Sequence, residues 1–278
     1  MSSLPPVFGV PTFCLITGAS RGLGQEMALT LGPLLGEGSL VVLTARSPSG
    51  LDTTRKQLTD RVPGLTVRTV EGDLGDGDDC QRTLPILFQD LEASRYRHAL
   101  LVHNAGSLGD MSYVRDLAGD FGHLEAYWTL NVASCIALTG RFLTAFPKAY
   151  GRRRTLVAVS SLCAIQATKS LALYCSSKAA RDMLMKTVAS EEPDLRVLSY
   201  APGILDTAMN QELRSEVSDP EVRRFMTDMC STRYFLTTAQ TCKTLVKVLK
   251  QDTFESGAHV DYWDIEQPPE NSISNNAS

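Results

Sequence analysis

A tyrosine and a lysine four residues apart are the first side chains in this sequence whose types and spacing could do chemistry. They lie in "YCSSKAARDMLM", where Tyr174 and Lys178 would share one face of a helix. A phenol ordinarily loses its proton near pH 10, which is too high for proton transfer at neutrality. A neighbouring ammonium favours the phenolate, so we expect Lys178 to lower the pKa of Tyr174. The pair is predicted to be a general acid, although the spacing also arises by chance.

A glycine-rich segment near the N-terminus predicts a site for a dinucleotide. A predicted strand runs into "TGASRGLG", where Gly18, Gly22 and Gly24 open a predicted helix. Backbone without a Cβ can approach a pyrophosphate closely, and a helix N-terminus offers free N–H donors. A plain structural turn is the alternative explanation.

The end of the second predicted strand, "LTARS", favours NADP(H) over NAD(H). An acidic residue about 20 residues after the glycines normally binds the ribose hydroxyls. Ala45 and Arg46 stand in its place, and Arg21 lies in the glycine loop itself. Two guanidinium groups suit a 2′-phosphate, because their forked donors bind phosphate oxygens in pairs. Alternatively, Arg46 is a solvated loop residue.

Seven apolar segments predict a single Rossmann-type, doubly wound α/β domain with a mostly parallel sheet of about seven strands. Helix-length intervals separate the segments, and several are apolar throughout, as in a parallel sheet covered on both faces. The segments are residues 13–17, 40–45, 66–72, 99–106, 155–161, 196–203 and 258–263. We expect the domain to cover residues 1–264, with a polar insertion at about 210–238 and a disordered tail at 265–278.

Composition and charge exclude several classes of protein. A net charge of −4 offers no broad positive field for nucleic acid, and the run "GRRRT" (151–155) is predicted to be a solvated loop. Seven scattered cysteines and four isolated histidines form no metal-ligand pattern. The cysteines are predicted to be free thiols in a reducing compartment. No apolar run is long enough to cross a membrane, so we expect a cytoplasmic protein.

The order and spacing of these motifs resemble the short-chain dehydrogenase/reductase family over nearly all of the first 265 residues. The matching motifs are "TGASRGLG" (17–24), Asp73-Leu74, "HNAG" (103–106), "LNVAS", "VSSL", "YCSSK" (174–178) and "PGILDT" (202–207). The resemblance implies a nicotinamide-dependent oxidoreductase. It also implies a homodimer formed through the helices that carry Asn131 and Tyr174.

The resemblance implies a role for each catalytic position. Tyr174 would donate a proton to the carbonyl oxygen, and Ser161, thirteen residues earlier, would hydrogen-bond that oxygen. Lys178 would bind the nicotinamide ribose and, together with a cationic nicotinamide ring, would lower the pKa of the tyrosine. The carbonyl of Asn131 would help to hold a water that relays protons to the lysine. Each residue also has an ordinary structural explanation, such as a strand end for Ser161 and a polar helix position for Asn131.

The resemblance further implies which residues line the cofactor and substrate sites. Asp73 would bind the adenine amino group unless it is an ordinary turn residue, and Thr207 would meet the carboxamide. The predicted cofactor set is Gly18, Ser20, Arg21, Gly22, Leu23, Gly24, Arg46, Ser47, Asp73, Leu74, Asn104, Lys178, Leu205 and Thr207. The predicted substrate set is Ser161, Leu162, Tyr174, Gly203 and Asp261.

A narrower resemblance is to the sepiapterin reductases, which use NADPH to reduce side-chain carbonyls of pterins in tetrahydrobiopterin synthesis. It is carried by "HNAGSLGDMS", "VSSLCAIQ", "LYCSSKAARDML", "SEEPDLRVLSYAPGILDT" and "SGAHVDYWD". It implies that Asp261 holds the amino-pyrimidine ring; otherwise Asp261 is a surface acid. Thr168 and Leu171 stand where those enzymes usually carry aromatic residues. A broader dicarbonyl or ketone reductase and a non-catalytic NADP-binding sensor therefore remain alternatives.

Overall fold

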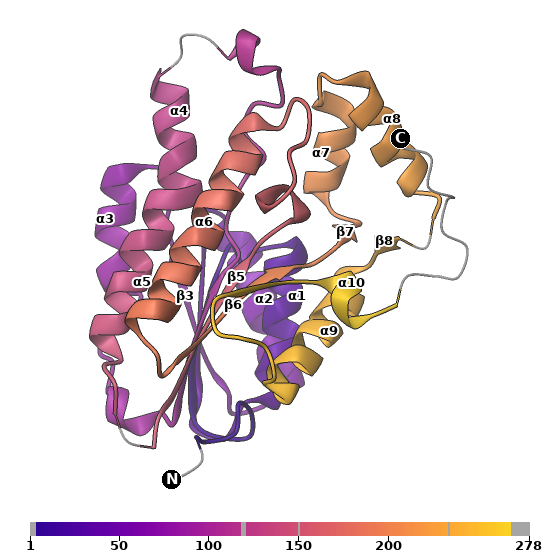
Figure 1. The fold of residues 1–278 in the computed structure, drawn as a ribbon. Coiled ribbons are helices and arrows are strands. Elements are labelled where there is room, and N and C mark those ends of the chain that lie inside the picture. Colours follow the sequence, from indigo (N-terminus) through magenta and orange to yellow (C-terminus); the bar gives the residue numbers. More distant parts are fainter. Residues whose placement is uncertain (1–3, 118–120, 150, 233, 268–278) are drawn as a thin grey trace.

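A seven-stranded sheet runs through the centre of the molecule (Figure 1). The computed structural model describes residues 4–117, 121–149, 151–232 and 234–267. The strand order is β3-β2-β1-β4-β5-β6-β9, and every neighbouring pair is parallel. These strands are β1 (Thr12–Thr17), β2 (Leu40–Ala45), β3 (Thr66–Glu71), β4 (His98–His103), β5 (Arg153–Val159), β6 (Leu195–Ala201) and β9 (Ala258–Asp261). The predicted doubly wound fold is confirmed.

Helices cover both faces of the sheet (Figure 1). On one face lie α1 (Gly22–Leu31), α2 (Pro48–Arg61) and α9 (Thr238–Gln251). On the other lie α3 (Gly77–Ile86), α5 (Ser134–Ala145) and α6 (Ala172–Glu191), with α4 (Phe121–Trp128) leading into α5. The other α-helices are α7 (Ala208–Glu216), α8 (Pro220–Met229) and α10 (Tyr262–Ile265), and β7 (Ile204–Leu205) and β8 (Phe235–Leu236) form a small parallel pair.

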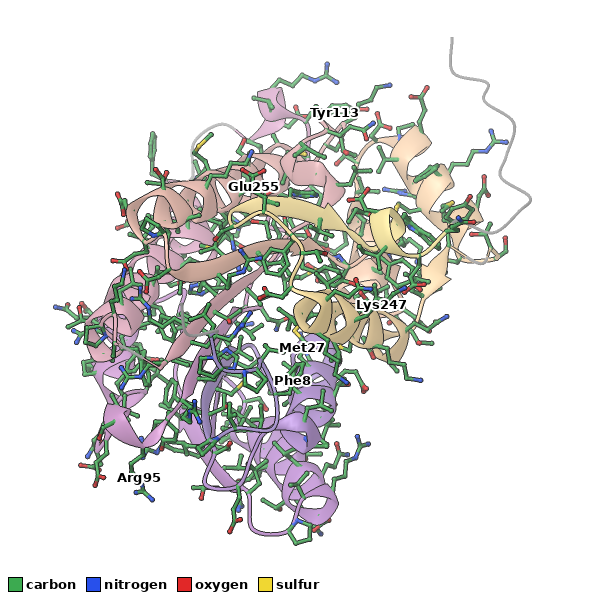
Figure 2. The ribbon with its side chains drawn as sticks, turned by 60° about the horizontal axis from the view of Figure 1, so that its bottom comes forward. Phe8, Met27, Arg95, Tyr113, Lys247 and Glu255 are labelled. Carbon is green, nitrogen blue, oxygen red and sulfur yellow. The ribbon has the colours of Figure 1, made fainter. Side chains whose placement is uncertain are left out.

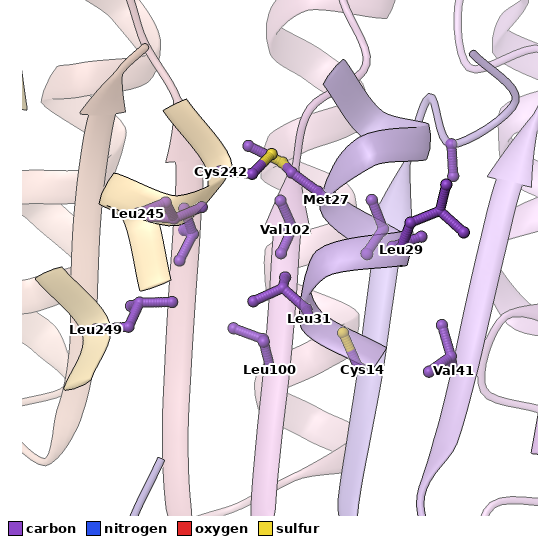
Figure 3. Close-up of a cluster of buried hydrophobic side chains, with 14 of the residues drawn as sticks. Cys14, Met27, Leu29, Leu31, Val41, Leu100, Val102, Cys242, Leu245 and Leu249 are labelled. Atoms are coloured by element: carbon purple, nitrogen blue, oxygen red, sulfur yellow. The ribbon is translucent and has the colours of Figure 1, made fainter. Parts of the chain in front are cut away.

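Burial on both faces explains why the strand sequences are apolar without alternation. In β1, Cys14 packs with residues of α1 and α9, whereas its neighbour Phe13 packs with residues of α5 on the opposite face. Figure 3 shows the first of these two clusters, where Met27 of α1 and Cys242 of α9 meet above the sheet. Successive side chains of a strand point to opposite faces, so each must be apolar to be buried.

Because all seven strands are parallel, their carboxyl ends lie at one edge of the sheet. Chain order reverses between β1 and β4, and the crevice at such a switch point is where doubly wound folds bind ligands. The helices α7 and α8 lie beside this edge (Figure 1). Figure 2 shows Tyr113, in the loop after β4, and Arg95, just before β4, at opposite ends of the molecule.

The prediction that residues 151–155 form a solvated loop is wrong. Arg153 and Arg154 belong to β5, and their side chains are 7% and 2% exposed. Arg154 donates to Glu192 at 2.7 Å and to Asp194 at 2.8 Å, and Arg153 pairs with Asp252, the residue that follows α9. A buried guanidinium is tolerated when carboxylates neutralise it.

Two predictions concern segments near the C-terminal part of the chain. The insertion predicted at about 210–238 lies between β6 and β9, and it contains most of α7 and all of α8. The sequence predicts a tail over residues 265–278. Ile265 instead ends the short helix α10, and residues 268–278 lie outside the described residues.

Candidate active site

One large cavity opens at the carboxyl edge of the sheet, where the segments after all seven strands meet. Its volume is about 2370 Å³. Pockets for drug-sized ligands measure roughly 300–1,000 Å³, so this cavity has room for a dinucleotide and a second molecule. Every residue predicted to bind cofactor or substrate lines it. Of the predicted catalytic residues, Ser161, Tyr174 and Lys178 line the cavity and Asn131 does not.

The glycine loop after β1 forms one wall of the cavity. Gly18 and Gly22 have φ angles of +66° and +57°, which favour glycine. A Cβ on Gly24 would lie 2.3 Å from the carbonyl oxygen of Gly18, so only glycine lets α1 begin this close to β1. The Asn104 amide donates to the carbonyls of Thr17 at 2.9 Å and Gly18 at 3.2 Å. The loop is therefore held open for a ligand at the N-terminus of α1.

Arg46 leaves the end of β2 with its side chain 70% exposed. Its guanidinium Nη1 lies 3.9 Å from Asp73 Oδ2, and Asp73 Oδ1 accepts the Gly75 amide at 2.9 Å. An exposed ion pair at that distance contributes little, so the guanidinium is available to an anion. Arg21, also exposed, directly precedes α1. The local chemistry fits an adenosine ribose that carries a 2′-phosphate.

Tyr174 and Lys178 lie one helical turn apart near the start of α6, as their spacing predicts. The Lys178 Nζ donates to the Val159 carbonyl at the end of β5 at 2.7 Å and lies 5.4 Å from the centroid of the Tyr174 ring. Ser161 follows β5, and its hydroxyl accepts the Cys163 amide at 3.2 Å, which caps a short 3-10 turn. The end of β5 and the start of α6 thus bring a hydroxyl, a phenol and an amine to one place.

In the protein alone the pKa of Tyr174 is raised, not lowered, and the predicted lowering by Lys178 together with a cationic nicotinamide ring stays a prediction. Burial raises the pKa of Tyr174, and a hydrogen bond from Ser161 offsets only part of that change. Burial also lowers the pKa of Lys178 to about 7, and the nearby charge of Arg181 acts in the same direction. Both shifts have one physical cause, because an apolar environment disfavours the charged form of each group.

Asn131 is fully buried behind the cavity wall. It lies in a π-helical turn (Thr129–Ala133) that joins α4 to α5, a feature frequent at functional sites. Its side-chain oxygen accepts the Ser107 amide at 3.1 Å, and its amide donates to the Tyr127 carbonyl at 3.0 Å. The side chain therefore ties this turn to the loop after β4. The water-holding role of its carbonyl stays a prediction.

The far end of the cavity contains the residues predicted to orient a substrate. Asp261 ends β9 and caps α10, where its Oδ1 accepts the Trp263 amide at 2.9 Å. Burial raises the pKa of Asp261. Of the two positions that lack the expected aromatic residues, Thr168 is half-buried and Leu171 is 3% exposed, and both line the cavity.

One wall of the cavity is apolar and was not predicted from the sequence. It is formed by α7, α8, the segment before β8 and α10. The wall consists of Leu213, Val222, Phe225, Met226, Met229, Tyr234 and Trp263. Residues 222, 225, 226 and 229 follow helical spacing within a segment that looks polar by composition. Hydrophobic periodicity, rather than composition, would have found this wall.

Other features of the described residues bear on the class of chemistry. All seven cysteines are free thiols. The described part of the chain contains no group of three or more His, Cys, Asp or Glu residues that could hold a metal ion. Within the same residues, no helix has the length and apolar character needed to span a membrane.

Comparisons with known proteins agree with this geometry. The model of the short chain dehydrogenase family matches residues 12–218. Sepiapterin reductase of Rattus norvegicus is 42% identical over 252 residues, which cover 91% of this chain and 96% of the rat protein. Sepiapterin reductase of Xenopus tropicalis is 38% identical over 90% of this chain and 96% of its own length. Benzil reductase of Bacillus subtilis is 29% identical over 72% of this chain and 77% of its own length.

Solved structures share the fold. The KRED1-Pglu enzyme superposes with a TM-score of 0.74 at 24% identity and covers 90% of this chain and 100% of its own. A Beutenbergia cavernae protein solved with bound NADP has a TM-score of 0.74 at 23% identity, covering 92% of this chain and 97% of its own. Both matches support the fold of the sheet and its helices.

Proposed function

Because the chain belongs to the short-chain dehydrogenase family, we propose that it is an NADPH-dependent carbonyl reductase acting on side-chain carbonyls of pterins. The family makes it an oxidoreductase with a nicotinamide cofactor and a small-molecule substrate. One observation carries the proposal: Ser161, Tyr174 and Lys178 line the same cavity as the glycine loop. The sepiapterin reductases that it resembles over nine-tenths of its length support the substrate.

We propose NADP(H) as the cofactor, with residues 1–264 as the domain that binds it. The glycine loop and the N-terminus of α1 would hold the pyrophosphate, and Arg21 and Arg46 would bind the 2′-phosphate. Asp73, Asn104 and Thr207 line the same cavity and would contact the rest of the dinucleotide. When bound in reduced form, the nicotinamide supplies hydride to the carbonyl carbon.

The residues of the chain would supply the proton and the charge stabilisation. Burial raises the pKa of Tyr174, so the phenol carries its proton at neutral pH but is a weak acid in the protein alone. The negative charge that develops on the carbonyl oxygen, together with the positive charges of Lys178 and the nicotinamide ring, would draw that proton to the substrate. The Ser161 hydroxyl would donate a hydrogen bond to that oxygen. A protonated Lys178 would place positive charge beside the phenolate that remains.

At the other end of the substrate, Asp261 would accept hydrogen bonds from the amino-pyrimidine ring of a pterin. A carboxylate pairs well with two neighbouring N–H donors, and fixing the ring would place the side-chain carbonyl near Tyr174. Loss of each ring-on-ring contact at Thr168 and Leu171 costs roughly 1 kcal/mol. The loss of these contacts weakens the preference for pterins, but Tyr174, Lys178 and Asp261 are all still present.

A broader dicarbonyl reductase is the second candidate function. The apolar wall formed by α7 and α8 would accept an apolar carbonyl compound as readily as a pterin. The similarity to a benzil reductase points the same way, although it is more distant than the similarity to sepiapterin reductases.

Steady-state oxidation of NADPH with sepiapterin, benzil and simple diketones tests the proposal. We expect sepiapterin to have the highest kcat/KM, and NADPH to be preferred to NADH. Turnover of diketones but not sepiapterin would establish the second candidate instead. Binding of NADPH without turnover across a carbonyl panel would favour a cofactor sensor.

We also propose a homodimer in the cytoplasm. Ile136 on α5 and Met183 on α6 are 51% and 61% exposed, so neighbouring helices present apolar side chains to solvent. A second copy that packs α5 and α6 against the same helices would cover both. Seven free thiols suit a reducing compartment.

A further inference from the structure

A buried serine, aspartate and histidine form a hydrogen-bonded network directly behind the catalytic residues. The Ser160 hydroxyl donates to Asp182 Oδ1 at 2.7 Å, and His259 Nδ1 lies 2.6 Å from Asp182 Oδ2. Ser160 and Asp182 are 3% and 5% exposed, and the His259 side chain is 11% exposed. The network joins the end of β5, the middle of α6 and the edge strand β9.

Each member of the network is adjacent to a residue of the proposed active site. Ser160 lies between Ser161 and Val159, and the Val159 carbonyl accepts the Lys178 ammonium at 2.7 Å. Asp182 lies one helical turn beyond Lys178 on α6. His259 lies two residues before Asp261 on β9, on the same side of that strand. The three elements that supply the hydroxyl, the amine and the substrate carboxylate are therefore connected here.

Asp182 and His259 shift each other's pKa towards the charged form of each group. A hydrogen bond to Asp182 raises the pKa of His259, and the charges of Asp182, Asp261 and Asp264 add to that shift against the effect of burial. Burial acts to raise the pKa of Asp182, but hydrogen bonds from His259 and Ser160 outweigh burial and lower it.

Three further groups complete the surroundings of Lys178. On α6, burial and the charge of Arg181 lower its pKa, whereas the charge of Asp182 acts to raise it. Cys135 of α5 and Cys163, after β5, act in the same direction as Asp182. The charge of Asp182 is therefore one influence on the pKa of Lys178, and His259 is the group that pairs with that charge.

We propose that Asp182 and His259 are positioning residues for carbonyl reduction: through Ser160 they fix the end of β5, and their paired charges lie close enough to Lys178 to influence whether it keeps its proton. Stabilising the fold alone does not require buried charged groups, because removing them from water costs free energy. Buried ion pairs can often be replaced by apolar residues at no loss of stability. In addition, His259 Nε2 is buried with no hydrogen-bond partner among the described residues. The proposal uses the proposed reductase activity as a readout but concerns different residues.

The test compares Asp182→Asn and His259→Gln with the unmutated protein, using whichever carbonyl compound that protein reduces best. We expect kcat to fall at least tenfold in both variants while the dissociation constant of NADPH stays within twofold. The glutamine amide can still donate to Asp182, so His259→Gln should retain more activity than His259→Leu. Equal losses in these two histidine variants would contradict the proposal.

The pH dependence of kcat separates positioning from a purely structural role. The alkaline limb of the plot of kcat against pH reports loss of the proton from Lys178. His259→Gln leaves the negative charge of Asp182 without its partner, so the pKa of Lys178 should rise and this limb should move to higher pH. Asp182→Asn removes that negative charge, so the limb should move to lower pH. Shifts in opposite directions support the proposal. Unchanged limbs, or shifts in one direction, overturn it.

A matched control comes from another buried histidine. His98, at the amino end of β4, bonds the Val7 carbonyl and the Thr155 hydroxyl, each at 2.9 Å. His98→Gln should lower thermal stability without changing kcat or its pH profile. An equal loss of kcat in His98→Gln would show that the His259 effect is structural.

A readout without turnover keeps the proposal separate from the proposed function. In an NMR titration of the His259 imidazole, the pKa should lie above that of a free histidine and fall towards the ordinary value in Asp182→Asn. An unshifted His259 would overturn the ionised pair whether or not any carbonyl compound is reduced. Conversely, a protein with a shifted His259 but no reductase activity would contradict the proposed function alone.

Discussion

At the scale of single residues, burial acts on Tyr174 and Lys178 in opposite directions. It strengthens the hold of the phenol on its proton and weakens that of the ammonium, whose pKa falls to about 7. The spacing of the two residues was predictable from the sequence because it depends only on helix geometry. The pKa shifts were not predictable, because they depend on how deeply the start of α6 is buried against the rest of the fold.

Lys178→Met should abolish reduction and stabilise the protein. The native state holds a lysine with a pKa of about 7, against an ordinary value of 10.5, so the unfolded state binds more protons between these pH values. The unmutated protein therefore gains stability as pH rises from 7 to 10.5. The variant lacks this cost, and its free energy of unfolding should be higher by roughly 1–4 kcal/mol below pH 7.

Urea denaturation at several pH values checks this prediction. The difference in stability between Lys178→Met and the unmutated protein should shrink as pH approaches 10.5. A difference that is independent of pH would show that the lysine proton does not contribute. A variant that is less stable at pH 6 would show that the ammonium is well compensated where it lies.

Arg46→Ala should weaken NADPH binding selectively. A hydrogen bond between charged groups contributes about 1.5–3 kcal/mol, so KM for NADPH should rise roughly tenfold to a hundredfold. KM for NADH should hardly change, because NADH carries no 2′-phosphate. Arg55→Ala is the matched control: Arg55 lies on the neighbouring α2, where it pairs with Asp52 at 3.2 Å. Equal effects on both cofactors would contradict the assignment of Arg46.

At the scale of elements, the glycine loop depends on the close approach of α1 to β1. Gly24→Ala would place a Cβ 2.3 Å from the Gly18 carbonyl oxygen, and neither backbone can move without disturbing the loop. Overpacking of this kind costs typically 1–3 kcal/mol. We expect a lower melting temperature and a large loss of NADPH affinity, measured by fluorescence titration.

Gly77→Ala is the control for the glycine prediction. Gly77 begins α3, and a Cβ there would meet no atom within 4 Å. This variant should bind NADPH normally and be at least as stable as the unmutated protein. If Gly24→Ala behaved like Gly77→Ala, the loop would not depend on close packing.

An element was predictable from the sequence where its signal is local, and was not where it depends on residues far away in the chain. The seven strands were predictable because burial on both faces leaves a continuous apolar run in each. Arg154 was misjudged because its partners, Glu192 and Asp194, are 38 and 40 residues away in the chain. The strands β7 and β8 have two residues each, which is too short for any periodic signal.

At the scale of the whole molecule, the parallel sheet brings residues from distant parts of the chain to one edge. The cavity residues of the predicted sets were predictable from motifs and their order, because most of them belong to segments that follow a strand of recognisable sequence. The pairing of Asp182 with His259, 77 residues apart, has no sequence signature. It exists because β9 pairs with β6 beside α6, which only the assembled fold shows.

Ile136→Glu combined with Met183→Glu should convert the proposed dimer into a monomer. Two carboxylates in an apolar interface would lose their hydration without gaining a partner. Sedimentation velocity should show one species of half the mass, and the fold should be retained because both side chains are exposed. Leu4→Glu, which changes an exposed apolar residue near the N-terminus, should leave the dimer intact. A double variant that still dimerises would exclude this face.

The central claim is that Tyr174 donates the proton when a carbonyl compound is reduced by NADPH, and Tyr174→Phe tests it most directly. The variant keeps the ring and its packing but loses the acid, so single-turnover oxidation of NADPH with sepiapterin should slow by roughly a hundredfold or more. NADPH should still bind with nearly unchanged affinity. Reduction at the normal rate by Tyr174→Phe, with NADPH and sepiapterin both bound, would contradict the account.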